Sequence, residues 1–348
     1  MIISRTPFRI SFFGGGTDYP VWYREHGGAV LATTINKYCY ITCRWLPPFF
    51  EHRSRIVYSK VETVASNGQI EHPAVRGVLQ FLQIERGVEV HHDGDLPART
   101  GLGSSSSFTV GLLHALYGLK GIMPSKPQLA RDATYMEQEL LKEHVGSQDQ
   151  IMAAFGGFNR IDFSTDGSFR VSPVILDEER LALLEDHLML VFTGLSRTAS
   201  EIAAAQVEAI PEKRRQLHAM CGMVEEAMRL LQGRDDLERF GRLLHEGWLL
   251  KRSLTNRIST PLIDELYEAS RRAGALGGKL LGAGGGGFLL LFVRPEEQAQ
   301  VRQALGGLLH VPFRVEHSGS RVIFYEPEAV PTPPPKEARL MSVAVNRT

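Results

Sequence analysis

The stretch LPARTGLGSSSSFTVGLLHAL, residues 96–116, places two glycines and four serines directly before an apolar run with helical periodicity. One serine is enough to cap an ordinary helix, and a glycine permits the tight turn that leads into it. Four serines behind Gly-Leu-Gly also leave several backbone N–H groups uncovered by large side chains, at the positive end of the helix dipole. Phosphate binds well at such a position. The stretch therefore predicts a phosphate-binding loop, with an ordinary helix start as the alternative.

The composition is typical of a soluble globular protein. The chain has 348 residues, 43% hydrophobic and 22% charged, which is long enough for two domains with separate cores. Lys plus Arg and Asp plus Glu both total 39, so the overall charge indicates neither nucleic acid nor a membrane surface as partner. The N-terminus lacks the apolar core of a signal peptide, and no stretch approaches the ~20 apolar residues that span a bilayer. Cys39, Cys43 and Cys221 lack Cys-x-x-Cys spacing, which predicts neither disulfides nor a zinc site and favours the reducing cytoplasm.

The pattern of apolar residues predicts an α+β protein. In the first half, strands are expected at 8–13, 37–46, 55–64 and 156–164, and helices at 107–119 and 125–141. In the second half, helices are expected at 200–210, 213–233 and 237–254, and strands at 287–294 and 320–327. We therefore expect a first domain over residues 1–180, a second α+β domain over 181–328, and a Pro-rich extended tail over 329–348.

Two more glycine clusters stand near the two ends of the chain. The first is FFGGGTDYP, residues 12–20, and the second is KLLGAGGGGFLLLFV, residues 279–293. Taken alone, the first is compatible with a simple turn, because Asp and Gly favour turns. The second is equally compatible with a close crossing of two backbones.

In this order, the three clusters resemble the three motifs of the GHMP kinases, the family of galactokinase, homoserine kinase, mevalonate kinase and phosphomevalonate kinase. The matching positions are Pro7, Arg9, Gly14, Thr17, Asp18 and Tyr19 in the first motif, Pro97, Gly101, Leu102, Gly103, Ser104, Ser105 and Ser106 in the second, and residues 282–287 in the third. The resemblance implies a two-domain fold, in which a mixed N-terminal sheet with helices binds ATP and a ferredoxin-like α+β domain follows.

The first motif departs from galactokinase, which has Gly-Glu-His-Thr-Asp-Tyr where this chain has three glycines before Thr17. Together with VGSQDQIMAAFGGFN, residues 145–159, the loop is most similar to the branch that phosphorylates the anomeric hydroxyl of D-glycero-D-manno-heptose 7-phosphate. The product expected from that resemblance is the 1,7-bisphosphate, an intermediate of GDP-heptose biosynthesis. The expected partner is thus a small phosphosugar, and nothing in the sequence specifies an oligomeric state.

Other functions stay open. A fucokinase-like enzyme or another sugar 1-kinase is the nearer alternative, and a non-catalytic sensor of sugar and ATP is the alternative of another class. The presence of Arg9, Ser105, Glu137 and Asp149 argues against a sensor. An isoprenoid kinase is disfavoured by the sugar signature that begins at Thr17.

The resemblance also implies how ATP and Mg²⁺ are held. The β- and γ-phosphates are expected to lie against the backbone N–H groups of Gly101, Leu102, Gly103, Ser104, Ser105 and Ser106. This is not a Walker A loop, because the Gly-Lys-Ser/Thr ending is absent. The expected Mg²⁺ ligands are Ser105, with Ser104 close behind, and Glu137, with Glu139 and Glu143 as alternatives to Glu137.

Catalysis is expected from two residues that match the family. Asp149 would accept the proton of the attacking sugar hydroxyl, with a turn or helix-capping Asp as the alternative interpretation. Arg9 would lie beside it and stabilise developing negative charge. The expected substrate-binding residues are Gly15, Gly16, Thr17, Asp18, Arg197, Gly284 and Gly285. The cation for the sugar phosphate is expected among Arg197, Lys251, Arg252 and Arg257.

Overall fold

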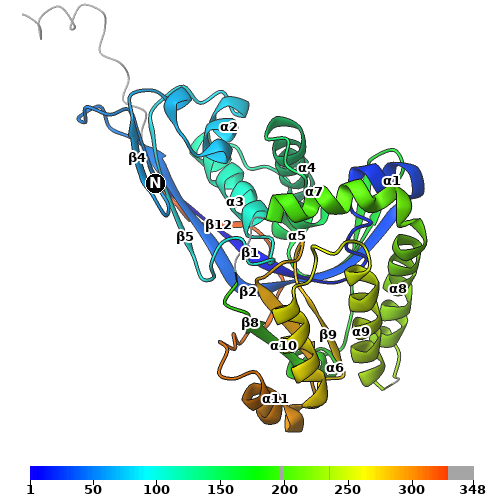
Figure 1. Ribbon diagram of the computed structural model, residues 1–348. Coiled ribbons are helices and arrows are strands. Elements are labelled where there is room, and N and C mark those ends of the chain that lie inside the picture. The colour runs from blue at the N-terminus through cyan, green and yellow to red at the C-terminus, as the bar shows by residue number, and fades with distance from the viewer. Residues whose placement is uncertain (196–198, 235, 328–348) are drawn as a thin grey trace, which may run out of the picture.

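The computed structural model describes residues 1–195, 199–234 and 236–327. They form two lobes, one built on a nine-stranded sheet and the other on a three-stranded sheet (Figure 1). Within these residues, no helix has both the length and the apolar character that crossing a membrane requires. The α+β fold expected from the sequence is confirmed.

The large sheet is organised around its two longest strands. Its members are β1 (Ile2–Phe13), β2 (Gly28–Trp45), β3 (Ser54–Val57), β4 (Val61–Val64), β5 (Val88–Gly94), β6 (Phe158–Phe163), β7 (Phe169–Pro173), β11 (Val315–Glu316) and β12 (Arg321–Tyr325). The main path runs β12-β1-β2-β5-β3-β4, while β6 and β11 also pair with β2, and β7 pairs with β6. All pairs are antiparallel except β3 with β5, which is parallel. The expected strand at 55–64 is therefore a hairpin of two short strands.

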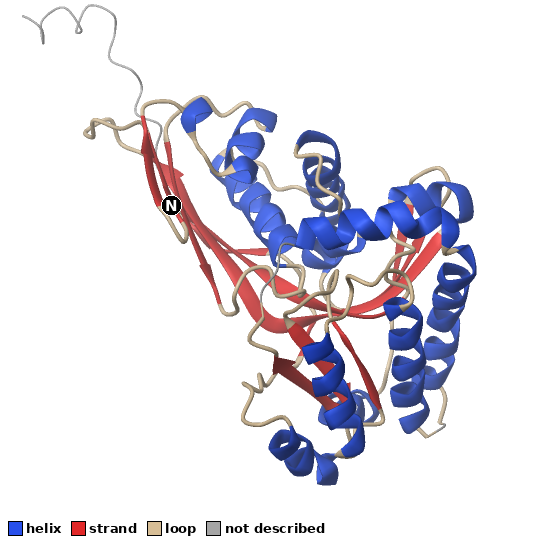
Figure 2. Ribbon diagram, in the orientation of Figure 1, coloured by secondary structure: helices blue, strands red, loops and turns tan. Residues whose placement is uncertain are grey.

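Helices cover one face of this sheet (Figure 2). They are α2 (Pro73–Phe81), α3 (Ser104–Leu119), α4 (Lys126–Tyr135) and α5 (Gln148–Phe155), while α1 (Pro20–His26) follows the first glycine cluster. Thirteen of the 16 residues of α3 are buried, because this helix lies between the sheet and the outer helices. Gly111 allows the close approach, since a Cβ there would lie 2.9 Å from Thr6 Oγ1 on β1. The middle of α3 is thereby packed closely against β1.

The second lobe has a small sheet of β8 (Leu188–Phe192), β10 (Phe288–Phe292) and β9 (Gly277–Leu280), in that antiparallel order. Its helices are α6 (Glu178–His187), α7 (Ala199–Ala209), α8 (Arg214–Gln232), α9 (Glu238–Arg252), α10 (Pro261–Arg272) and α11 (Gln298–Ala304). An isolated antiparallel bridge between His310 and Val191 lies beside β8, at the position of a fourth strand. The order of strands and helices is that of a ferredoxin-like fold, as expected.

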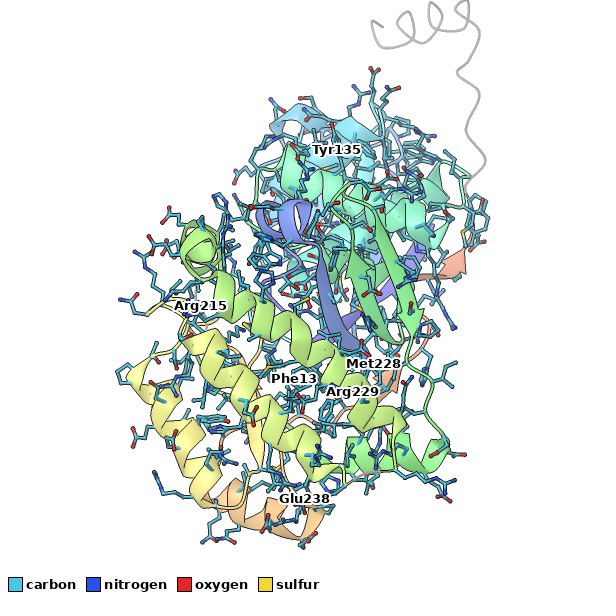
Figure 3. The ribbon with its side chains drawn as sticks, turned by 90° about the vertical axis from the view of Figure 1, so that its right-hand side faces the viewer. Phe13, Tyr135, Arg215, Met228, Arg229 and Glu238 are labelled. Atoms are coloured by element: carbon cyan, nitrogen blue, oxygen red, sulfur yellow. The ribbon has the colours of Figure 1, made fainter. Side chains whose placement is uncertain are left out.

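The two lobes are joined by helix packing as well as by the chain. Figure 3 shows α8, which carries Arg215, Met228 and Arg229, running beside α9, with Phe13 at the end of β1 near both helices. The Phe13 ring meets the ring of Phe240 on α9 edge to face at 5.2 Å between centroids. The C-terminal end of β1 is therefore in contact with the second lobe.

The structure corrects the expected boundary of the second domain. Residues 315–325 lie within the range 181–328 that was assigned to it, yet β11 and β12 belong to the large sheet. β12 pairs with the first residues of β1, from Ile2 opposite Tyr325 to Arg5 opposite Arg321. This pairing satisfies the backbone groups along an edge of β1 that would otherwise be unpaired. The tail expected at 329–348 lies outside the described residues.

Candidate active site

The glycine- and serine-rich loop ends at the N-terminus of α3, as its sequence predicts. Gly101 and Gly103 have φ angles of +85° and +73°, and Gly103 is the residue that precedes the helix. Ser104 Oγ accepts a hydrogen bond from the backbone N–H of Arg99 at 3.1 Å, which closes the loop on itself. The N–H groups of the first helical turn have no acceptor within the helix. They are available to an anion at the positive end of the helix dipole.

Arg9 and Asp149 form a bidentate ion pair beside this loop. Arg9 Nε donates to Asp149 Oδ1 at 2.7 Å and Nη2 donates to Oδ2 at 2.8 Å, while Nη1 donates to the carbonyl oxygen of Gly101 at 2.6 Å. The Arg9 side chain is buried and 24% of the Asp149 side chain is exposed. A Cβ on Gly103 would lie 3.3 Å from Asp149 Oδ2, so the loop passes directly over the carboxylate. The pair fixes a carboxylate next to the helix start.

Glu137 is a buried carboxylate with one oxygen left free. It lies on a single turn of π-helix, Met136–Leu140, and is 0% exposed. Its Oε2 accepts hydrogen bonds from Ser106 Oγ at 2.8 Å and from Gln150 Nε2, whereas Oε1 has no partner among the described residues. Burial raises the pKa of Glu137 to about 7. A free buried oxygen beside a serine hydroxyl suits a hard divalent cation such as Mg²⁺.

The serine beside Glu137 is not the one expected from the sequence. Ser105 is exposed, and the hydroxyl that reaches the carboxylate belongs to Ser106. Consecutive helical residues point about 100° apart, so the two serines cannot both face Glu137. Among the alternatives to Glu137, Glu139 is exposed and pairs with Lys142 at 3.0 Å. The geometry thus favours Ser106 over Ser105, and Glu137 over Glu139.

The first glycine cluster forms a tight loop next to α5. Asp18 is 2% exposed, and its oxygens accept from Gly16 N at 2.9 Å and from Gln148 Nε2 at 3.0 Å. Burial raises the pKa of Asp18. Gly15 faces Gln148, since a Cβ there would lie 3.7 Å from Gln148 Nε2. Gly15, Gly16 and Asp18 are therefore brought to the end of α5 that carries Asp149.

Thr17 has a different role from the one expected. Its side chain is fully buried, and the hydroxyl shares its proton between the carbonyl oxygens of Gly14 and Ala29, at 2.8 and 2.9 Å. A hydroxyl has one proton, so none is left for a sugar oxygen. Thr17 holds the loop onto β2 rather than facing the site.

The third glycine cluster packs directly on the second. A Cβ on Gly101 would lie 2.4 Å from the carbonyl oxygen of Leu281, and a Cβ on Gly287 would lie 2.1 Å from that of Thr100. Only glycine permits such close backbones. Gly284 and Gly285 lie against Ile258, whose carbonyl oxygen accepts from Gly285 N at 2.9 Å. These two glycines shape the loop of the third cluster, and their expected contact with the substrate stays a prediction.

The four candidate cations for a sugar phosphate differ in their surroundings. Arg197 lies outside the described residues. Arg252 pairs with Asp264 at 3.1 Å and lies over the ring of Trp248, and Arg257 is exposed. Lys251 is buried, and its Nζ donates to the carbonyl oxygen of Leu280 at 3.1 Å and to that of Gly282. Of the three that the structure describes, Lys251 is thus the one placed at the glycine clusters.

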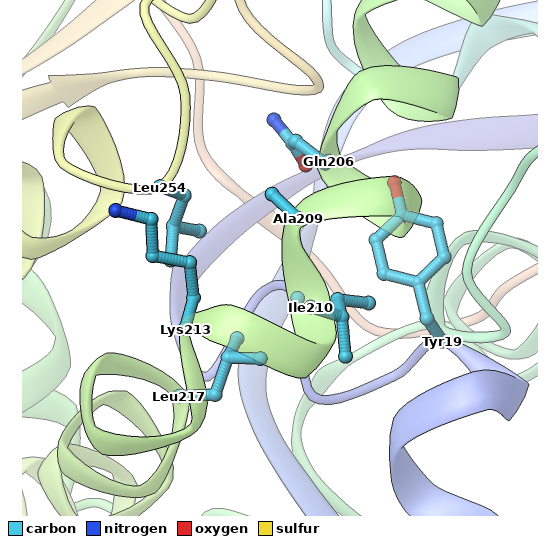
Figure 4. Close-up of a pocket in the computed structure, with 8 residues that line it drawn as sticks. Tyr19, Gln206, Ala209, Ile210, Lys213, Leu217 and Leu254 are labelled. Atoms are coloured by element: carbon cyan, nitrogen blue, oxygen red, sulfur yellow. The ribbon is translucent and has the colours of Figure 1, made fainter.

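Several residues of the site escaped the sequence analysis. A small pocket of about 10 Å³ lies between Gly16 and Tyr19 of the first glycine cluster and the end of α7 (Figure 4). The other residues that line it were not singled out from the sequence: Gln206, Ala209, Ile210, Lys213, Leu217 and Leu254. Gln206 Nε2 donates to the carbonyl oxygen of Ala283 at 2.6 Å, which ties α7 to the third cluster. Lys279 is also buried, although a lysine in the otherwise apolar run before that cluster was a visible signal.

Comparisons with known proteins identify the family to which the chain is similar. The pattern of the GHMP kinases N terminal domain matches residues 72–157, and that of the GHMP kinases C terminal domain matches residues 224–309. The D-glycero-alpha-D-manno-heptose 7-phosphate kinase of Campylobacter jejuni is 27% identical over 315 residues, which cover 87% of this chain and 93% of that protein. A mevalonate kinase of Thermococcus sibiricus is 30% identical over 72% of this chain and 73% of its own length.

The fold comparison points to the same group. A D-glycero-D-manno-heptose 1-phosphate kinase from Bacteroides thetaiotaomicron superimposes with a TM-score of 0.76 at 26% identity, covering 94% of this chain and 100% of that one. The second and third glycine clusters pack on each other, and an ion pair and a buried carboxylate lie near the start of α3. The chain belongs to the GHMP kinase family, whose members transfer phosphate from ATP.

Proposed function

We propose that this kinase phosphorylates the anomeric hydroxyl of D-glycero-D-manno-heptose 7-phosphate, giving the 1,7-bisphosphate for nucleotide-heptose biosynthesis. The observation that carries the proposal is the bidentate pair of Arg9 and Asp149 beside the start of α3. The Campylobacter relative supports the choice of sugar through its name. The name of the Bacteroides structure places the phosphate on carbon 1 instead, so the reacting position is part of the proposal and of its test.

Asp149 is proposed as the proton acceptor. Its carboxylate is held by both Arg9 donors and retains an exposed edge that a sugar hydroxyl can approach. A positioned base of this kind contributes about 10²- to 10⁴-fold to the rate. Arg9 orients the carboxylate and, through its third contact to Gly101, fixes the distance between the base and the phosphate loop.

The transferred phosphate is proposed to lie on the N–H groups of Gly101–Ser106. Charge on the phosphoryl oxygens increases in the transition state, and preorganised donors at a helix N-terminus stabilise it. Glu137 and Ser106 would hold Mg²⁺, which neutralises phosphate charge when bound. The unpartnered Oε1 of Glu137 is what makes this carboxylate a better ligand than a purely structural one.

The acceptor is proposed to lie against Gly15 and Gly16, beside the exposed edge of Asp149. Asp18 acts there through Gln148, because its oxygens are already occupied by Gln148 and by the N–H of Gly16. The glycines that replace the Glu-His pair of galactokinase leave room for a larger sugar. Arg197 remains a proposed contact to the sugar phosphate.

Replacing Glu137 with glutamine is expected to raise the Mg²⁺ concentration for half-maximal activity by about tenfold, because a neutral amide is a weaker ligand than a carboxylate. The pKa of Glu137 is about 7, so the ionised form of the wild type increases as the pH rises through that value. Mg²⁺ titrations at pH 6 and pH 8 should therefore show tighter activation at pH 8 in the wild type and no such change in Glu137→Gln.

The matched control is Glu139→Gln, which alters an exposed carboxylate two residues away. It should titrate as the wild type does. An unchanged Mg²⁺ requirement in Glu137→Gln would move the proposed metal site away from this residue.

A panel of free and phosphorylated sugars, assayed for ADP release with ATP and Mg²⁺, tests the substrate. Heptose 7-phosphate is expected to have a kcat/KM at least about tenfold above that of free heptose, since one charge-assisted hydrogen bond contributes about 1.5–3 kcal/mol. Phosphorus NMR of the product should show a new phosphate on the anomeric carbon.

The same panel separates the alternatives. Equal turnover of free heptose, fucose or galactose would contradict the phosphosugar assignment and favour a fucokinase-like enzyme. Binding of sugar and ATP without phosphorylation of any acceptor would favour the sensor.

A further inference from the structure

Two buried lysines lie where the lobes meet, and the proposed mechanism gives them no joint role. Lys251 on α9 is 7% exposed and Lys279 on β9 is 6% exposed. Lys251 Nζ donates to the carbonyl oxygens of Leu280 and Gly282, and Lys279 Nζ donates to that of Phe12 at 2.8 Å. One lysine thus contacts the start of the third glycine cluster, and the other contacts Phe12 at the start of the first cluster.

Their hydrogen bonds leave donors over. An ammonium group has three N–H bonds, whereas Lys251 has two acceptors and Lys279 has one among the described residues. Within the residues that the structure describes, neither lysine forms an ion pair within 4.0 Å. Carbonyl contacts alone do not require a charged donor, and burying an amine that can ionise is costly without an anion.

The charged groups around the lysines are those of the catalytic centre. Burial lowers the pKa of Lys251 to about 7, with Arg9 lowering it further and Asp18 and Asp149 acting in the opposite direction. Burial also lowers the pKa of Lys279 far below its ordinary value, and the charges of Lys251 and Arg9 add to the effect. Lys251 Nζ contacts the carbonyl oxygen of Leu280, the residue that follows Lys279, so the two lysines share this part of the lobe junction.

The two nearby carboxylates cannot neutralise both lysines, because Arg9 already pairs with Asp149 and only Asp18 is left. Both oxygens of Asp149 are bound by Arg9, and those of Asp18 accept from Gly16 and Gln148. Fully protonated, the cluster holds three cations, Arg9 and the two lysines, against these two carboxylates. A phosphate group would supply the missing negative charge and would favour the protonated amines.

We propose that Lys251 and Lys279 form a phosphate site at the junction of the two lobes, which takes up protons as a substrate phosphate enters the catalytic centre. The phosphate comes either from the nucleotide, as its terminal group, or from the acceptor, as the phosphate it already carries. The acceptor source rests on the proposed function, whereas the nucleotide source needs only the family activity.

Calorimetry of the wild-type enzyme at pH 7.5 in two buffers of different ionisation enthalpy measures the proton uptake directly. The ligands are a non-hydrolysable ATP analogue against ADP, and heptose 7-phosphate against heptose. In one of these two pairs of ligands, net proton uptake is expected when the ligand with the additional phosphate binds, that is, the ATP analogue or heptose 7-phosphate. Uptake in the ATP pair identifies the nucleotide as the source, and uptake in the sugar pair identifies the acceptor.

Lys251→Met and Lys279→Met keep the side-chain length and remove the amine. Each is expected to reduce the affinity ratio within the responding pair by about tenfold, since it removes one charge-assisted contact. Lys251→Arg should retain most of the ratio. The control Lys142→Met changes a lysine whose side chain is 73% exposed and should alter neither ratio.

The proposal is overturned if no phosphate ligand causes proton uptake by the wild type. It is also overturned if both affinity ratios are unchanged in folded Met variants, because a purely structural lysine would lower stability without distinguishing the ligands. If the Met variants do not fold, the wild-type calorimetry still decides. Absence of heptose 7-phosphate binding together with proton uptake on nucleotide binding would refute the proposed sugar and leave the lysine site standing.

Discussion

Asp149→Asn is expected to lower turnover by about 10²-fold or more while ATP binding stays nearly unchanged. The amide has the shape of the carboxylate but cannot accept the proton of the attacking hydroxyl. One oxygen remains to accept from Arg9, so the arginine keeps part of its pairing and the phosphate loop keeps its contact at Gly101. Single-turnover rates and calorimetric binding of ATP measure the two effects separately.

The matched control is Asp132→Asn, which alters another buried carboxylate. Asp132 accepts from Tyr117 Oη at 2.7 Å and from Gln128 Nε2 at 2.6 Å, and it lies on α4 rather than at the site. This variant should lose stability and keep its turnover. Equal turnover in Asp149→Asn and wild type would remove Asp149 from the mechanism, and a parallel loss of ATP binding would give it a structural role instead.

Local sequence was sufficient to predict a helix behind the serine run, although the expected range 107–119 begins three residues after the observed start at Ser104. Gly103 and the serines after it satisfy the requirements of a helix start at one place in the chain, so no distant contact had to be known. Arg9 and Asp149 are 140 residues apart, and their pairing came from the family resemblance rather than from spacing. The structure supplies the bidentate geometry that the resemblance only implied.

The points on which the structure differs from the expectations share a physical cause, because each depends on contacts between distant segments. To choose Ser106 over Ser105, one must know how α3 is rotated relative to the π-helical turn that carries Glu137. The role of Thr17 depended on Ala29 of β2, whose carbonyl oxygen accepts a hydrogen bond from the Thr17 hydroxyl. The return of β12 to the large sheet depended on an unpaired edge of β1, which hydrophobic periodicity does not reveal.

Gly101→Ala is expected to disrupt the contact between the two lobes and lower kcat/KM by about 10²-fold, the effect of a displacement of about 1 Å at a catalytic centre. The added methyl group would lie 2.4 Å from the carbonyl oxygen of Leu281, a backbone atom that cannot rotate away. Moving the loop to relieve this overlap would also break the hydrogen bond from Arg9 Nη1 to the Gly101 carbonyl. Catalysis should therefore be affected more than overall folding.

Gly121→Ala separates the overlap from simple backbone strain. Gly121 has a φ of +74°, close to the +85° of Gly101, but a Cβ there would meet nothing within 4 Å. It should lower the free energy of unfolding by about 1–2 kcal/mol, the cost of a left-handed alanine, and leave kcat/KM unchanged. Gly101→Ala adds about 1–3 kcal/mol of overpacking to the same strain. Urea unfolding and steady-state kinetics on both variants measure the difference. If the two variants had equal free energies of unfolding and equal kcat/KM, the glycine loops could separate at Gly101 and Leu281 without loss of activity. Catalysis would then not depend on their close approach.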